Sequence, residues 1–176
     1  MKKYSEYLLV DGYNVIFAWS DLSKTAETSL EDARIKLLDI LCDYQGYKQN
    51  FVIVVFDAHQ IRRGAGSVVP YNNIQVVFTK EAESADNFIE KTTAILAKHD
   101  KVRVVTSDYT EQIIIMGHGA IRISANEFRQ EIENLRSAAQ KLLNKRPVKA
   151  NQLMDLLDDK TAQMLEEMRR NRSDYD

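Results

Sequence analysis

The chain has 176 residues, of which 44% are hydrophobic and 28% charged, and its formal net charge is −2. These totals describe one globular domain with room for a core, and they exclude a disordered chain or a histone-like polycation. No apolar run approaches the roughly 20 residues of a membrane helix, and no signal-peptide pattern is present, so we expect a cytoplasmic protein without membrane contacts. The single cysteine, Cys42, excludes an internal disulfide framework and a Cys-rich zinc site, and its helical spacing favours a buried thiol.

Strand and helix signals alternate along the chain. Continuous apolar runs predict buried strands, first at Leu8–Val10 and then over residues 51–56. Between them, a start at Ser29 that resembles a capping box predicts a helix that Gly46 stops. Residues 60–73 contain two glycines and a proline and predict a mobile loop. The remaining strands are expected at residues 74–78, 102–106 and 120–123. The remaining helices are expected at residues 84–98, in a short segment after residue 110 that ends at Met116, and from residue 124 to Pro147.

This order of elements predicts an α/β fold with a mostly parallel sheet and right-handed crossovers. From Ser124 onward the pattern becomes helical and charged, with a narrow apolar seam. We therefore expect a domain over residues 1–146, which includes its long last helix, and a C-terminal helix with a frayed tail over residues 147–176.

Acidic residues stand where predicted strands end or where a helix begins. Asp11, Asp57 and Asp108 each follow a strand, and Asp86 lies in the first turn of a helix. All strands of a parallel sheet end at one edge, and a helix entered from that edge begins there, so these acids can cluster in space. Their mutual repulsion would be relieved by a cation, and oxygen ligands without His or Cys favour Mg²⁺ or Mn²⁺ over zinc. Such an ion activates water and stabilises a phosphodiester during in-line displacement.

Structural interpretations of the same residues stay open. An Asp after a strand is often a turn former, and an acid in the first turn of a helix is favoured by the helix dipole alone. Asn14 either fixes the Asp11 carboxylate or a metal-bound water, or its amide only caps the next turn. Ser107 either contacts phosphate or only caps the helix that follows it. Gly64-Ala65-Gly66 lacks the third glycine and the strand-to-helix setting of a dinucleotide fingerprint, so no nucleotide cofactor is expected.

Four motifs occur in an order that resembles one protein family. They are Leu8-Leu9-Val10-Asp11-Gly12-Tyr13-Asn14, Val54-Val55-Phe56-Asp57-Ala58-His59, Thr79-Lys80-Glu81 through Ala85-Asp86, and Thr106-Ser107-Asp108. Together they resemble the YacP-like branch of the NYN-domain proteins, which belong to the PIN-like nuclease fold. The resemblance runs from residue 7 to about residue 130 and is more specific than any single motif.

The resemblance implies a three-layer PIN-like sandwich and a Mg²⁺-dependent endoribonuclease. It implies that Asp11, Asp86 and Asp108 bind the metal, that Asn14 and Asp57 support them, and that a water activated by the metal attacks the phosphodiester. The bacterial branch that the chain resembles includes a ribosome-associated endonuclease that cuts mRNA in the ribosomal A site. The implied partners are therefore mRNA and the ribosome, with its rRNA; the sequence does not define an oligomeric state.

RNA that approaches an acidic cleft needs positive charge around it. The residues that we expect to contact RNA are Arg62, Arg63, Lys80, Ser107, Tyr109 and Arg122. Residues 122–149 hold seven basic and three acidic side chains, a net charge of +4, which either faces rRNA or forms an ordinary solvated helix surface. Tyr13, Trp19 and Tyr109 could stack on a base, and Trp19 could equally cover the core.

Two other classes of function are compatible with parts of this pattern. A non-catalytic RNA-binding or ribosome-binding adaptor would keep the fold and lose cleavage. A haloacid-type phosphatase also begins with an Asp at a strand end, but it needs a second Asp two residues later, where this chain has Tyr13.

Overall fold

The structure is a computed structural model of the chain, and it describes residues 4–57, 65–80, 83–107 and 117–145. The chain divides into two compact units, Met1–Arg136 and Ser137–Asp176. The sheet, its two cores and the acidic residues at its carboxyl edge lie within the first unit. The predicted boundary at residues 146 and 147 and the predicted last helix lie outside the described ranges, so both stay predictions.

The first unit is built around a six-stranded sheet with the order β3-β4-β2-β1-β5-β6. Its parallel strands are β1 (Glu6–Asp11), β2 (Phe51–Phe56), β4 (Ile74–Lys80), β5 (Lys101–Val105) and β6 (Ile121–Ile123). An antiparallel edge strand, β3 (Ala65–Tyr71), pairs with β4. The predicted mostly parallel α/β sheet is therefore confirmed.

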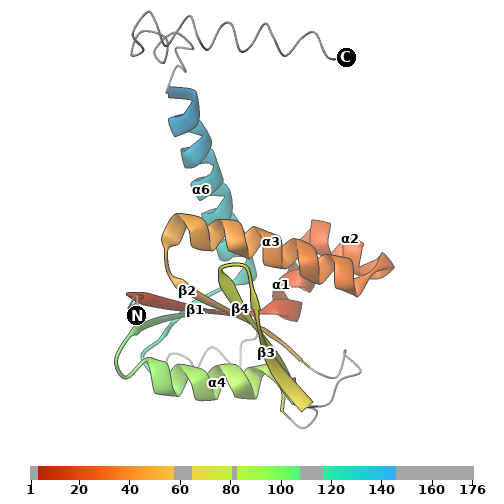
Figure 1. Cartoon of the computed structure of the whole chain (residues 1–176), viewed down its shortest axis with the longest axis vertical. Coiled ribbons are helices and arrows are strands. Elements are labelled where there is room, and N and C mark those ends of the chain that lie inside the picture. The colour runs from red at the N-terminus through yellow and green to blue at the C-terminus, as the bar shows by residue number, and fades with distance from the viewer. Residues whose placement is uncertain (1–3, 58–64, 81–82, 108–116, 146–176) are drawn as a thin grey trace, which may run out of the picture. The chain divides into compact units, whose positions relative to one another are not determined.

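Helices cover both faces of this sheet and produce two hydrophobic cores. On one face, α1 (Gly12–Ala18), α2 (Ser20–Thr28), α3 (Leu30–Lys48) and the start of α6 (Ala125–Lys145) bury residues such as Leu8 and Val10. On the other face, α4 (Ala85–Leu96) packs over Leu9, which points the opposite way along β1. Figure 1 shows the sheet between α3 and α4. A strand buried on both faces explains why β1 is apolar without alternation.

Two parts of the fold differ from the sequence predictions. The segment between β1 and Ser29 forms the two short helices α1 and α2, which the sequence pattern does not predict because seven and nine residues are too few to show a helical period. Gly46 does not stop α3, which continues to Lys48 and ends at Gln49 in the left-handed region at φ 58°. Tyr44 and Gln45 are buried against the rest of the domain, and this packing outweighs the weak helix propensity of one glycine.

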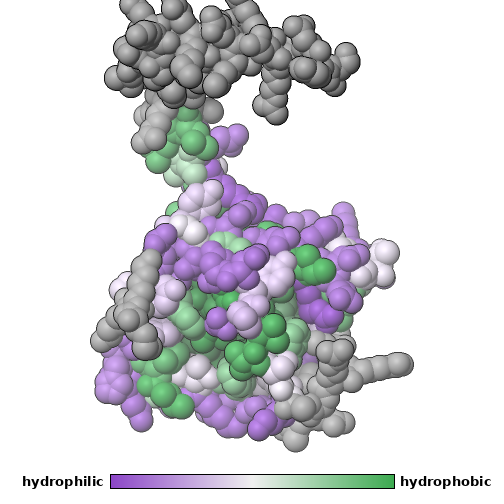
Figure 2. Space-filling view, in the orientation of Figure 1, coloured by the Kyte–Doolittle hydropathy of each residue, from purple (hydrophilic) through white to green (hydrophobic). Residues whose placement is uncertain are grey.

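The predicted loop at 60–73 is wrong over its second half. Residues 65–71 form β3, joined to β4 by a tight turn in which Asn72 has a positive φ of 49°. As an edge strand, β3 leaves Val68 and Val69 exposed, and Figure 2 shows hydrophobic surface over this hairpin. A strand exposed on both faces has no alternating pattern, and Pro70 is tolerated because it lies at the sheet edge. Cys42 next to this turn is partly buried, and its thiol lies 3.8 Å from the Tyr71 carbonyl oxygen.

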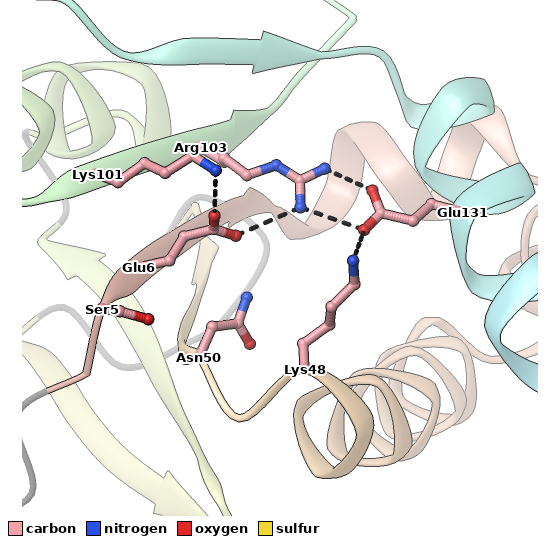
Figure 3. Close-up of a pocket in the computed structure, with 7 residues that line it drawn as sticks. All are labelled: Ser5, Glu6, Lys48, Asn50, Lys101, Arg103 and Glu131. Carbon is pink, nitrogen blue, oxygen red and sulfur yellow. Dashed lines mark hydrogen bonds and ion pairs between the residues drawn. The ribbon is translucent and has the colours of Figure 1, made fainter.

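At the amino-terminal edge of the sheet, a network of charged side chains joins β1, β5, α3 and α6. Arg103 donates to both oxygens of Glu131, to Tyr44 at 3.1 Å, and to Glu6 at 3.4 Å. Lys48 and Lys101 complete it with ion pairs of 2.9 Å to Glu131 and Glu6, respectively (Figure 3). Burial by itself would raise the pKa of Glu131, but its hydrogen bonds from Arg103 and Lys48 lower that pKa to about 2. The network therefore holds α6 against the sheet through compensated charges.

None of the helices in the described ranges is both long enough and apolar enough to cross a lipid bilayer.

We expect Gly12→Ala to destabilise the domain. A Cβ at Gly12 would lie 2.2 Å from Cε1 of Phe56, and since Phe56 is fully buried the overlap should reduce the free energy of unfolding by about 2 kcal/mol. Urea denaturation measures this change. Gly46→Ala is the matched control, because a Cβ there meets nothing within 4 Å and should stabilise α3 by about 0.5–1 kcal/mol. Equal effects of the two substitutions would contradict the close packing of Gly12 on Phe56.

We expect Arg103→Ala to reduce the free energy of unfolding by roughly 3 kcal/mol at neutral pH, because it leaves Glu131 and Glu6 partly buried without their shared cation. Arg136→Ala, which breaks a more exposed pair with Asp43, should cost less than about 1 kcal/mol. Since the pKa of Glu131 is lowered, its stabilising contribution is present above pH 4.5 and is lost as the pH falls toward 2. The deficit of Arg103→Ala should therefore shrink in acid, and a deficit that is independent of pH would contradict this assignment.

Candidate active site

Asp11 lies at the carboxyl end of the central strand β1, between β2 and β5. Its side chain is 9% exposed, and Oδ1 accepts a hydrogen bond of 3.0 Å from the backbone N–H of Asn14. The carboxylate therefore caps the first turn of α1, which starts at the next residue. Gly12 permits this abrupt change from strand to helix beside the Phe56 ring.

Two further acids act on Asp11 from neighbouring elements. Asp57 directly follows β2, and Asp86 lies in the first turn of α4. Burial raises the pKa of Asp11 to about 6, and the negative charges of Asp86 and Asp57 act in the same direction, against the backbone hydrogen bonds from Asn14 and Tyr13. The structure thus brings three of the four acids predicted from sequence within electrostatic range of one another.

The Asn14 side chain connects α1 to the segment after β5. Its Oδ1 accepts a hydrogen bond of 3.0 Å from the backbone N–H of Ser107, so its amide does not cap a following turn. The Ser107 hydroxyl in turn accepts a hydrogen bond of 3.3 Å from the backbone N–H of Ala125, the first residue of α6. This contact is made to α6, whereas the helix predicted directly after Ser107 lies outside the described residues, so both interpretations of Ser107 stay open. Together these bonds fix the chain that leads from β5 toward residue 108.

The predicted metal ligands are only partly described. Asp108 lies outside the described ranges, as do the predicted RNA contacts Arg62, Arg63 and Tyr109. Within those ranges, no three His, Cys, Asp or Glu side chains lie close enough together to hold a metal ion.

The donors that are described nevertheless fit a hard cation. Asp11 and Asp86 offer carboxylate oxygens, and Mg²⁺ is commonly held by one or two carboxylates while its other ligands are water. The pKa of Asp11 is raised mainly by burial and further by the negative charges of Asp86 and Asp57, and a divalent ion would relieve that repulsion.

The two remaining basic residues predicted to contact RNA lie at or near the carboxyl edge of the sheet. Lys80 is the exposed last residue of β4. Arg122, in β6, donates through Nε to the backbone carbonyl of Thr106 at 3.2 Å, which places its guanidinium beside the chain that leaves β5.

Several other side chains considered for RNA contact instead pack or pair within the domain. The Tyr13 ring is buried against Phe56, with 5.1 Å between ring centroids, so it cannot stack on a base. Trp19 is also in the core and donates to the Ala125 carbonyl at 2.8 Å. In the basic stretch at 122–149, Arg129 pairs with Asp21 and Glu133, and Arg136 pairs with Asp43. These ion pairs reduce the positive charge that the described part of α6 presents.

Sequence reasoning overlooked one basic side chain near this edge. Arg34 lies in the second turn of α3 and donates from Nη1 to the Tyr13 hydroxyl at 3.0 Å. The predicted helix start at Ser29 could have located Arg34, because a helix that leads back to β2 must begin near the edge where β1 ends. Residues in its first two turns therefore lie near that edge.

We expect Asp11→Asn to raise the free energy of unfolding at pH 7.5, in EDTA, by roughly 1–3 kcal/mol. The pKa of Asp11 is raised from 3.8 to about 6, so protonation stabilises the folded state and this contribution is lost as the pH rises through 6. As the pH falls below 3.8, the carboxyl becomes protonated in the unfolded state as well, and the variant should lose its advantage. Urea denaturation at about pH 3 and at pH 7.5 measures both values. Asp32→Asn, at an exposed position in the first turn of α3, is the control and should show no such gain; equal gains in both variants would contradict the burial argument.

Comparison with known proteins identifies the family of the chain. Residues 8–170 match the YacP-like NYN domain family. YacP of Bacillus subtilis (strain 168) is 43% identical over 141 residues, which cover 80% of this chain and 82% of YacP. The crystal structure of Rae1 (YacP) from Bacillus subtilis matches with a TM-score of 0.69 and 38% identity, over 96% of this chain and 97% of that one. The crystal structure of a mutant of Rae1 matches with the same TM-score and 35% identity, over 93% and 99%. The predicted PIN-like fold is thereby confirmed, and the chain belongs to the YacP-like NYN domain family, a family of nuclease type.

Proposed function

We propose that this protein is a Mg²⁺-dependent endoribonuclease that cleaves mRNA, and that it acts in association with the translating ribosome. The observation that supports hydrolysis is the buried Asp11 carboxylate, which has a pKa raised to about 6 and lies in the field of Asp86 and Asp57. Strongly perturbed carboxylates at the carboxyl edge of a parallel sheet are typical of catalytic sites. Membership of a nuclease-type family supports the same reaction class.

In this proposal Asp11, Asp86 and Asp108 hold the ion, Mg²⁺ or Mn²⁺, and Asp57 adds negative charge beside them. When bound, the ion neutralises charge on the phosphodiester and lowers the pKa of water. The ion would also relieve the repulsion among the acids, so its binding should lower the pKa of Asp11.

The remaining residues of the site orient these groups. The backbone N–H of Asn14 holds Oδ1 of Asp11 and so orients the carboxylate toward the proposed ion. The Asn14 side chain holds Ser107, and therefore restrains the chain that leads into Asp108. Orientation of this kind reduces the reorganisation needed when the substrate binds.

Association with the ribosome is proposed on two grounds. The chain resembles the bacterial branch that contains the ribosome-associated A-site endonuclease. Its net charge of −2 also gives it no general attraction to RNA, so a partner that raises the local concentration of mRNA would increase cleavage.

The test is cleavage of one mRNA with and without translating ribosomes, each in Mg²⁺, Mn²⁺ and EDTA. We expect cleavage in either metal, none in EDTA, and more with ribosomes present. Asp11→Asn and Asp86→Asn should each reduce the rate at least about 100-fold, because each removes a carboxylate from the ion. Asp32→Asn is the matched control at the first turn of α3 and should cleave at the wild-type rate.

Each outcome separates the proposal from its alternative. Cleavage that persists in EDTA, or in both site variants, contradicts the metal mechanism. Ribosome binding by wild-type protein that never cleaves RNA would instead identify a non-catalytic adaptor. Equal cleavage with and without ribosomes would contradict the ribosome-associated role while leaving the endoribonuclease assignment intact.

A further inference from the structure

Arg34 differs from three other arginines of the described structure in having no ion pair with a carboxylate there. Arg103, Arg129 and Arg136 each form at least one ion pair with a carboxylate. Arg34 is partly buried, and within the described ranges its guanidinium contacts only the Tyr13 hydroxyl. A guanidinium has five donor N–H groups, so most of its hydrogen-bonding capacity is available to a ligand.

The position of Arg34 follows from the chain path. After β1 ends, α1 and α2 remain near that edge, and α3 then runs back across the sheet toward the start of β2, as Figure 1 shows. Arg34 is only four residues after the start of α3 at Leu30, so it lies toward the edge where Asp11 is found. The Tyr13 ring links the two places, because Tyr13 is two residues after Asp11 and its hydroxyl meets Arg34 at 3.0 Å.

The Tyr13 contact also restricts where the guanidinium points. The ring is held by Phe56 at 5.1 Å and by Phe17 at 6.3 Å between centroids, so its hydroxyl is a fixed acceptor. An arginine held by a neutral acceptor keeps its full charge and is oriented in advance, and a planar fork of donors fits a phosphate with two hydrogen bonds.

We propose that Arg34 binds a backbone phosphate of the RNA substrate, adjacent to the phosphodiester that is cleaved at Asp11, and that Tyr13 is its positioning residue. This inference rests on the proposed endoribonuclease function. Because Arg34 is separated from Asp11 by the length of the Tyr13 side chain, it contacts the RNA strand beside the reacting group and not the reacting group itself. It also supplies positive charge next to an acidic site that would otherwise repel RNA.

The test measures binding of a fluorescein-labelled single-stranded RNA of about 15 nucleotides by anisotropy in EDTA, where the proposed hydrolysis does not occur. Arg34→Gln should weaken binding about tenfold at about 0.1 M salt and reduce the slope of log K against log salt by about 0.7, the value for one phosphate contact. Arg34→Lys should retain the salt slope and recover part of the affinity, because it keeps the charge and loses the fork.

Two further variants separate phosphate binding from a structural role. Tyr13→Phe keeps the ring against Phe56 and removes only the acceptor, so it should weaken binding about threefold and leave the salt slope unchanged. Lys36→Gln is the matched control, because Lys36 is an exposed cation on the same helix whose amine bonds to Thr25 at 3.1 Å; it should change affinity less than twofold. If Arg34 only anchors Tyr13, both Arg34→Gln and Tyr13→Phe will lower the free energy of unfolding and neither will change RNA affinity.

The kinetic consequence is measured on the substrate that the wild-type protein cleaves. Arg34→Gln should raise KM about tenfold and change kcat less than threefold, because the contact is made to bound RNA before the reaction as well as during it. An unchanged affinity, salt slope and KM in Arg34→Gln would overturn the inference while leaving the endoribonuclease proposal intact. Absence of RNA binding by the wild-type protein at micromolar concentration would overturn it as well, and absence of cleavage alone would overturn the proposed function only.

Discussion

A carboxylate buried at the carboxyl end of the central strand is the constraint on which the rest of this site depends. Asp11 is 9% exposed, and Asp86 and Asp57 add negative charge to its surroundings. Burial of a charge without a cation destabilises a fold, so the arrangement is maintained at the expense of stability. The Asn14 backbone N–H and the close packing of Gly12 on Phe56 hold the carboxylate in place despite this repulsion.

Charged side chains are arranged differently at the two edges of the sheet. At the amino-terminal edge, Arg103 lies between Glu6 and Glu131, and two lysines complete the compensation. Those charges connect four elements and stabilise the fold. At the carboxyl edge, burial and the negative charges of Asp86 and Asp57 together raise the pKa of Asp11. Perturbed carboxylates of this kind are typical of sites that bind a ligand.

The helix α1, which follows β1, connects the acidic site to two other parts of the domain. Asn14 reaches the segment after β5 through Ser107, and Tyr13 reaches α3 through Arg34. A short helix of seven residues therefore connects Asp11 both to the chain that leads into Asp108 and to an arginine without a carboxylate partner in the described structure. An acidic site for RNA needs both features, because the ion must be held firmly and the polyanion must still be attracted.

The amino-acid sequence by itself determined the parallel sheet and the positions of the acids along it. Strands such as β1 and β2 are buried on both faces, so they appear as continuous apolar runs that end in Asp11 and Asp57. The motif order also identified the family. Tertiary structure alone decided the features that have no local sequence pattern. The strand β3 lies at the sheet edge and is exposed on both faces. The helices α1 and α2 are too short to be stable alone, and packing against the core stabilises them. The Asn14–Ser107 and Arg34–Tyr13 contacts join residues 93 and 21 positions apart, and the raised pKa of Asp11 depends on burial and on neighbours that only the fold brings together.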